Sequence, residues 1–203
     1  MINEKSNLPG AIITAAGLSS RMGCFKPLLK IGDTPAVERV INTFLAAGVK
    51  TIVLVTGNKA KELENSLNQF DLVFLKNENY ENQDMFSSIK IGLEFLKNKC
   101  NKVFITPVDI PLFNSETVEL LLKSEAPFSV PVFNNKSGHP VILNKDSIHK
   151  VLNYNGNGGL KGAIKTFSIK THHIQVNDQG ILFDMDTKED YEKILELNKT
   201  INL

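Results

Sequence analysis

The stretch TAAGLSSRMGCFKPLL, residues 14–29, combines a flexible backbone with fixed positive charge. Its polar and flexible positions are Gly17, Ser19, Ser20, Arg21, Gly23 and Lys26. Glycines allow the backbone to approach a ligand, and successive backbone N–H groups can then form an anion nest. A guanidinium fork suits phosphate oxygens, and a lysine adds a mobile point charge. These residue types predict a polyphosphate-binding loop, and the alternative is a surface turn with solvated charges.

The loop departs from both common phosphate-binding motifs. A P-loop requires a lysine directly after its second glycine, whereas Lys26 lies three positions beyond Gly23. The dinucleotide fingerprint requires G-x-G-x-x-G, which the segment after Gly17 lacks. The chemistry of a phosphate cradle is therefore present without either familiar spacing.

The elements that position this loop are short apolar runs alternating with amphipathic segments. Strand-like runs cover residues 10–16, 50–57, 71–75 and 102–109, and helix-like segments cover 35–48, 59–67 and 84–98. This alternation predicts a single-domain, three-layer α/β/α fold with a Rossmann-like, mostly parallel sheet. Ligands of such sheets bind beyond the carboxyl ends of the strands, which is where the loop begins.

The pattern loosens after about residue 125. Two short strand candidates, PFSVPVF (127–133) and HPVIL (139–143), predict a hairpin or an antiparallel edge. Alternation over 165–176 predicts another strand, and 187–198 a final helix. We expect one domain over residues 1–203, with a nucleotide-binding half at 10–110 and an acceptor-binding half at 111–203.

Composition narrows the class of protein. The chain has 203 residues and a formal net charge of +1, so we expect no nucleic-acid or membrane partner. The N-terminus shows no secretory signal, and no apolar run approaches the ~20 residues of a membrane span. The only cysteines are Cys24 and Cys100, which favours a reduced, cytoplasmic location.

The string TAAGLSSRMGCFKPLLKIGDTP, residues 14–35, resembles the signature of the MobA-like nucleotidyltransferases, A-A-G-x-S-x-R-M-G-x-x-K-x-L. It is most similar to the molybdenum cofactor cytidylyltransferase branch. The resemblance implies CTP or another nucleoside triphosphate as substrate, and the AAG triplet favours CTP. It also implies catalytic roles for Arg21, Lys26 and Asp109. The expected nucleotide-binding residues are Ala15, Ala16, Gly17, Leu18, Ser19, Ser20, Arg21, Gly23, Lys26, Ser87 and Ser88.

Ser87 and Ser88 enter through DMFSSIKIGL (84–93), which is similar to the family's G-M-x-x-S-[IL]-x-x-G-L. Their alternative interpretation is as ordinary residues at a helix start. Two acidic segments resemble family metal sites, TPVDIP (106–111) and FDMDTKEDY (183–191). They predict Mg²⁺ on Asp109 and Asp186, with Asp184 in a secondary place, because Mg²⁺ prefers carboxylate oxygens. Turn or capping roles are the alternative for these aspartates.

Two further segments are similar to acceptor-site motifs of the family. NNKSGHPVIL (134–143) resembles G-x-x-G-H-P-V, and NGNGGLKGAI (155–164) resembles G-D-x-G-x-R. The expected acceptor-binding residues are Gly138, His139, Pro140, Gly159 and Lys161. Asn157 and Lys161 replace the family's aspartate and arginine, which leaves the identity of the acceptor open.

Together these features predict transfer of CMP from CTP to the terminal phosphate of molybdopterin, with Mg²⁺ as cofactor and pyrophosphate as the second product. The resemblance also suggests a molybdenum hydroxylase as a partner. The alternatives are a nucleotidyltransferase for a sugar or alcohol phosphate, and a non-catalytic carrier of the molybdenum cofactor.

Overall fold

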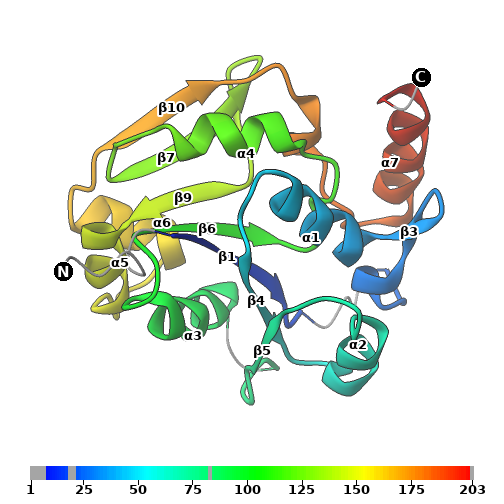
Figure 1. Ribbon diagram of the computed structural model, residues 1–203, viewed down its shortest axis with the longest axis horizontal. Helices are drawn as coiled ribbons and strands as arrows, with labels where there is room; N and C mark the ends of the chain where they lie inside the picture. The colour runs from blue at the N-terminus through cyan, green and yellow to red at the C-terminus, as the bar shows by residue number, and fades with distance from the viewer. Residues whose placement is uncertain (1–7, 18–21, 82–83, 202–203) are drawn as a thin grey trace.

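The computed structural model describes residues 8–17, 22–81 and 84–201. Its main sheet has the strand order β10-β7-β9-β6-β1-β4-β5, with β8 paired to β7 (Figure 1). The strands are β1 (Pro9–Ala15), β4 (Thr51–Thr56), β5 (Val73–Lys76), β6 (Lys102–Pro107), β7 (Phe128–Phe133), β8 (Lys136–Ser137), β9 (Val141–Asn144) and β10 (Thr171–Gln175). A second, two-stranded sheet pairs β2 (Lys30–Ile31) with β3 (Thr34–Pro35).

Helices cover both faces of the main sheet. They are α1 (Ala36–Ala46), α2 (Ala60–Ser66), α3 (Met85–Leu96), α4 (Ser115–Leu122), α5 (Lys145–Leu152), α6 (Gly159–Thr166) and α7 (Lys188–Ile201), with short 3-10 turns η2 (Lys26–Leu28) and η3 (Gln179–Leu182). Apolar residues of α1, α2 and α4 share one core cluster, and those of α3, α5 and α6 share another. The predicted three-layer α/β/α fold is therefore confirmed.

Alternation along the central strands divides their side chains between the two cores. Ile13 of β1 packs into the cluster of α1 and α4, whereas its neighbour Ile12 packs into the cluster of α3 and α5. Both side chains are fully buried. Apolar residues at successive positions are what a strand covered on both faces requires.

The antiparallel strand β9 lies inside the sheet and not at its edge. β7 and β9 pair antiparallel, which agrees with the predicted hairpin. β9 also pairs antiparallel with β6, and the edge position falls to β10, which runs parallel to β7. The sequence indicated the pairing sense, but strand order depends on contacts between distant segments.

The strand predicted over 165–176 is wrong at its start. Residues 159–166 form α6, so the segment 155–164, which resembles an acceptor-site motif, contains the N-terminal part of a helix. The strand β10 begins only at Thr171. Helices α4 and α5 had no counterpart in the prediction, although Asn114 and Asn144 cap them by accepting the backbone N–H groups of Thr117 and Ser147.

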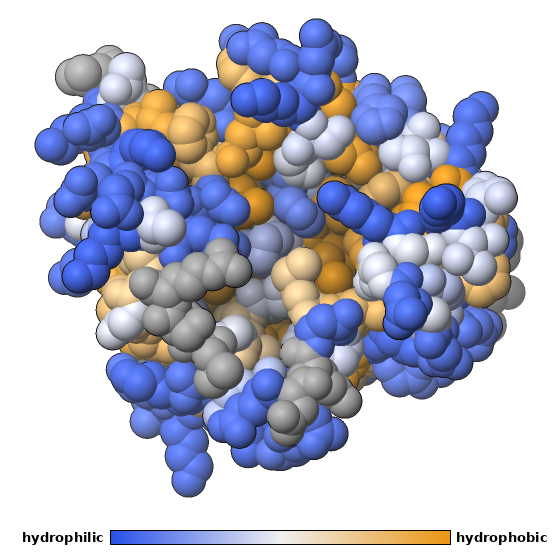
Figure 2. Space-filling model, turned by 180° about the vertical axis from the view of Figure 1, so that it is seen from behind, coloured by the Kyte–Doolittle hydropathy of each residue, from blue (hydrophilic) through white to orange (hydrophobic). Residues whose placement is uncertain are grey.

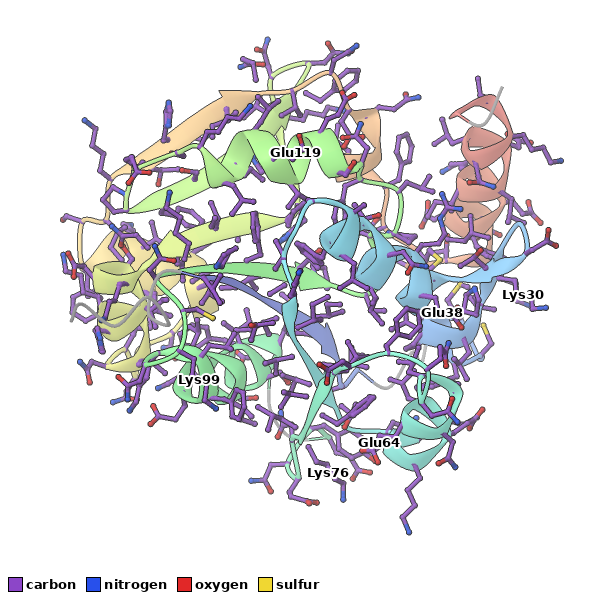
Figure 3. The ribbon with its side chains drawn as sticks, in the orientation of Figure 1. Lys30, Glu38, Glu64, Lys76, Lys99 and Glu119 are labelled. Carbon is purple, nitrogen blue, oxygen red and sulfur yellow. The ribbon has the colours of Figure 1, made fainter. Side chains whose placement is uncertain are left out.

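Charged side chains are dispersed over the surface. Figure 3 labels six that come from different parts of the chain: Lys30, Glu38, Glu64, Lys76, Lys99 and Glu119. Across residues 8–17, 22–81 and 84–201, no helix combines the length and the apolar character that crossing a bilayer would require.

Candidate active site

A cavity of about 180 Å³, with charged and polar side chains in its wall, lies at the carboxyl ends of β1 and β6. Its walls come from the loops that follow β1, β5 and β6, together with the start of α3. The lining residues are Thr14, Ala15, Ala16, Gly17, Lys26, Pro27, Asn77, Tyr80, Asp84, Met85, Ser88, Pro107, Val108 and Asp109. The parallel strands converge there because their ends meet at one edge of the sheet.

Lys26 occupies the first position of η2 and is 8% exposed. Its Nζ donates a hydrogen bond to Asp186 Oδ1 at 2.9 Å and lies 3.6 Å from Asp109 Oδ2. Residues separated by up to 160 positions thus meet at one ammonium group. A buried lysine needs such partners, because an unpaired charge is costly inside a protein.

A backbone contact brings the two aspartates together. The Met185 N–H donates to the Asp109 carbonyl oxygen at 2.9 Å, and the Met185 side chain is fully buried. Met185 packs in a small core with Ile31 and Ile194, between the small sheet and α7. The packing of the C-terminal segment therefore places Asp186 beside Lys26.

The carboxyl group of Asp109 sits in an environment short of positive charge. Burial raises its pKa, Lys26 opposes that rise, and the charges of Asp186 and Asp184 add to it. Raised pKa values follow when desolvation and like charges outweigh an opposite charge. A site with this imbalance would be stabilised by an additional cation.

The donor chemistry at Asp109 and Asp186 fits Mg²⁺. Magnesium is commonly held by one or two carboxylates together with water and substrate phosphates. Asp184 is exposed, and in the described part of the chain no set of three or more histidine, cysteine or acidic side chains is arranged as a metal site.

The glycine loop is placed beside this cavity in part. Ala15, Ala16 and Gly17 line it, whereas Leu18, Ser19, Ser20 and Arg21 lie outside the described residues. Gly23 has φ +65°, in the left-handed region that favours glycine. The φ of Gly17 lies outside that region.

The two serines of α3 have different surroundings. Ser88 is buried and lines the cavity, whereas Ser87 does not line it. Ser87 instead belongs to the helix start, where its N–H donates to Asp84 Oδ1 at 3.3 Å. The sequence reasoning missed Asn77, whose Nδ2 donates to both serine hydroxyl groups at 3.1 Å. Its position directly after strand β5 was the available signal.

A second and larger cavity of about 710 Å³ adjoins the first. Both are lined by Asp84, Met85 and Pro107. Its walls are mainly apolar, from α3, β6, β7, β9 and α6: Phe86, Ile89, Ile105, Phe128, Val130, Val141, Leu160 and Ile164. Figure 2 shows a hollow on the rear face, with apolar surface inside and hydrophilic side chains around it.

Basic groups stand at the margin of the larger cavity. Its lining includes the four predicted acceptor residues Gly138, His139, Gly159 and Lys161. The fifth, Pro140, is buried and is not among the lining residues. The lining also includes Lys165 and His173, which the sequence analysis had not selected, and Gly158, the N-cap residue of α6. The sequence analysis had predicted no helix at this position.

The segment containing His139 is fastened to η3. The His139 N–H donates to the Ile181 carbonyl oxygen at 3.0 Å, and a Cβ atom on Gly138 would lie 2.2 Å from that oxygen. Glycine is therefore required for this close approach. Burial lowers the pKa of His139, a hydrogen bond with the Ile105 carbonyl opposes the shift, and the charge of Lys161 adds to it.

Comparison with known proteins finds relatives of similar sequence and similar fold. The chain is 27% identical to the molybdenum cofactor cytidylyltransferase of Escherichia coli K12 over 184 residues, which covers 89% of this chain and 92% of that protein. A nucleotidyl transferase structure from Methanothermobacter thermautotroptrophicus superposes with TM-score 0.84 at 20% identity, covering 97% and 100% of the two chains. A Mycobacterium tuberculosis H37Rv structure in complex with manganese gives 0.77 at 18% identity, covering 94% and 99%.

The model of the MobA-like NTP transferase domain matches residues 11–174, which include most of β1, the glycine loop and the lining residues of both cavities. The match covers far more than half of the chain. Asp186, which meets Lys26, lies beyond the matched segment and is brought to the site by the packing of Met185. This protein belongs to the MobA-like NTP transferase family.

Proposed function

We propose that this protein transfers CMP from CTP to the terminal phosphate of molybdopterin and releases pyrophosphate. The observation that carries the proposal is the junction of two unlike cavities. A small cavity is lined by the charged residues Lys26 and Asp109, and a larger, mainly apolar cavity with basic groups at its margin opens beside it. A nucleotide and a bulky phosphorylated acceptor would meet where Asp84, Met85 and Pro107 border both.

The triphosphate would occupy the smaller cavity. Lys26 would exchange its contact with Asp186 for the β- and γ-phosphates, and the backbone around Gly17 would approach the same oxygens. We assign Arg21 to the same group from the motif. Such donors stabilise the leaving pyrophosphate where negative charge develops.

Asp109 and Asp186 would hold the divalent ion, which we propose is Mg²⁺. When bound, Mg²⁺ neutralises charge on the phosphate oxygens. An acceptor phosphate oxygen attacks the α-phosphorus as the bond to pyrophosphate breaks, so one P–O bond forms and one is lost. Because that oxygen is already anionic, the protein needs no strong general base, and positioning supplies most of the acceleration.

The larger cavity would hold the acceptor. Its apolar walls suit a flat heterocycle such as a pterin. A small sugar or alcohol phosphate would leave most of these walls uncovered. Lys161 and Lys165 would meet the acceptor phosphate, together with the N-terminus of α6, where backbone N–H groups favour anions. This difference in fit favours molybdopterin over the smaller acceptors.

The test is calorimetric titration of the purified protein with CTP, GTP and ATP in the presence of Mg²⁺, followed by pyrophosphate release with molybdopterin added. We expect preferential binding of CTP and release of one pyrophosphate for each acceptor consumed. Preference for GTP would overturn the choice of nucleotide. Binding of molybdopterin without pyrophosphate release would instead identify a cofactor carrier.

A further inference from the structure

Asn77 is a buried amide at the wall of the nucleotide cavity. It is 2% exposed, and its backbone N–H donates to the Thr56 carbonyl oxygen at 2.8 Å, which fastens the end of β5 to the end of β4. A fully buried amide at a ligand cavity has few ways to satisfy its hydrogen bonds. The partners it uses therefore determine what neighbouring groups can offer a ligand.

The orientation of this amide is set by a donor that cannot act as an acceptor. The backbone N–H of Asn79 donates to Asn77 Oδ1 at 3.1 Å. The oxygen must face that N–H, which leaves Nδ2 directed at Ser87 Oγ and Ser88 Oγ, each 3.1 Å away. The two hydrogens of the amide nitrogen thus serve two hydroxyl oxygens.

The two serines differ in what their own hydrogens do. Ser87 Oγ donates its hydrogen to the Asp84 carbonyl oxygen at 2.7 Å. Ser88 Oγ accepts from Asn77, and within residues 8–17, 22–81 and 84–201 no group is seen to accept its hydrogen. Ser88 is 2% exposed and lines the cavity.

We propose that Asn77 is a positioning residue that keeps the Ser88 hydroxyl group a hydrogen-bond donor toward the nucleotide. The inference rests on the proposed function and adds the polarity of one contact. The charged groups of this cavity suit phosphates and metal, so the uncharged hydroxyl suits an uncharged acceptor atom, such as a carbonyl oxygen of the base. Asn77 contributes by preventing Ser88 from turning its hydrogen toward the protein.

The variant Asn77→Asp tests this polarity directly, because it keeps the shape and removes the two donor hydrogens. The new carboxylate would accept a hydrogen bond from the Ser88 hydroxyl group, and the lone pairs of Ser88 Oγ would then face the nucleotide. We expect the Kd and the KM for CTP to rise roughly tenfold, because a hydrogen bond to the nucleotide is lost and two acceptor atoms then face each other. The kcat should stay close to that of the wild type.

A double-mutant cycle with Ser88→Ala separates this effect from added charge. If Asn77 acts through Ser88, Asn77→Asp weakens CTP binding much less in the Ser88→Ala background than in the wild type. Ser88→Ala alone weakens CTP binding several-fold, and this holds even if Asn77→Asp does not fold. Asn68→Asp, an exposed substitution of the same kind, is the matched control and binds CTP as the wild type does.

Equal losses in both backgrounds, or wild-type affinity in Ser88→Ala, would overturn the inference while leaving the proposed function intact. A wild-type protein that bound no nucleoside triphosphate would overturn both. Thermal unfolding of each variant shows whether the loss is one of binding or of folding.

Discussion

The two adjoining cavities differ in where their charged side chains lie. The smaller one concentrates charge, with a buried ammonium group in contact with two carboxylates. The larger one is an apolar chamber whose charged groups stand at its margin. Charges in the first are partly desolvated and strongly coupled, whereas those in the second remain partly hydrated. Substitutions in the smaller cavity should therefore cost more than those in the larger.

The largest effect is expected for Asp109→Asn. Turnover should fall by at least about a hundredfold, because the variant removes a charge that we assign to the metal and the phosphates. Stability should be unchanged or higher at neutral pH, because burial and neighbouring carboxylates raise the pKa of Asp109 and make its charged form unfavourable. That advantage should vanish as the pH falls and the wild-type carboxyl group becomes protonated.

Pyrophosphate release and thermal unfolding measure these two expectations for Asp109→Asn. The exposed Asp33→Asn is the control, with wild-type turnover expected. Full turnover in Asp109→Asn would show that the smaller cavity does not carry the chemistry.

The next effect in size is expected for Lys26→Met, which keeps the length of the side chain and removes its charge. CTP binding should weaken by roughly tenfold to a hundredfold, the range for losing a hydrogen bond to a charged group. Calorimetry of CTP binding is the measurement. Lys30→Met, an exposed substitution four positions further along, should bind CTP normally, and equal losses in the two variants would contradict the assignment.

A smaller and different effect is expected for Lys161→Ala in the larger cavity. The KM for the acceptor should rise several-fold while the affinity for CTP stays unchanged, because a partly hydrated lysine contributes only about 1 kcal/mol. Lys161→Arg should retain or improve acceptor affinity through its planar fork. Steady-state kinetics checks this, with Lys150→Ala as the control. A loss of CTP affinity in Lys161→Ala would contradict the assignment of different ligands to the two cavities.

The smallest effect concerns His139 and pH. Its pKa is lowered in the folded protein, mainly by burial, so the unfolded chain takes up the proton more readily as the pH falls below about 6.5. The wild type should lose stability on acidification by at most about 1.4 kcal/mol per pH unit through this group. His139→Gln should lose less, and the exposed His149→Gln should behave as the wild type in denaturant titrations between pH 7.5 and 5.5.

The two cavities also differ in how far sequence predicts them. Lys26 lies at the end of the glycine loop that follows β1, and Asp109 lies just after β6, so local patterns identify both. The larger cavity draws walls from α3, β7, β9, β10 and α6, which are distant along the chain. Lys165 and His173 gave no local signal, and the helix that begins at Gly159 was not predicted. Asn77 follows β5 directly, and its partners Ser87 and Ser88 belong to a recognised motif, but no local pattern indicated that the amide contacts them.

The sequence by itself determined the alternating α/β pattern, the glycine loop with its charges and the acidic residues around 109 and 186. These depend on local periodicity and residue type, which contacts with distant segments do not alter. The tertiary structure alone decided that β9 lies inside the sheet, that Asp186 meets Lys26 and that two cavities adjoin at Met85. Those outcomes depend on which distant surfaces bury one another, and packing of the folded chain as a whole sets that choice.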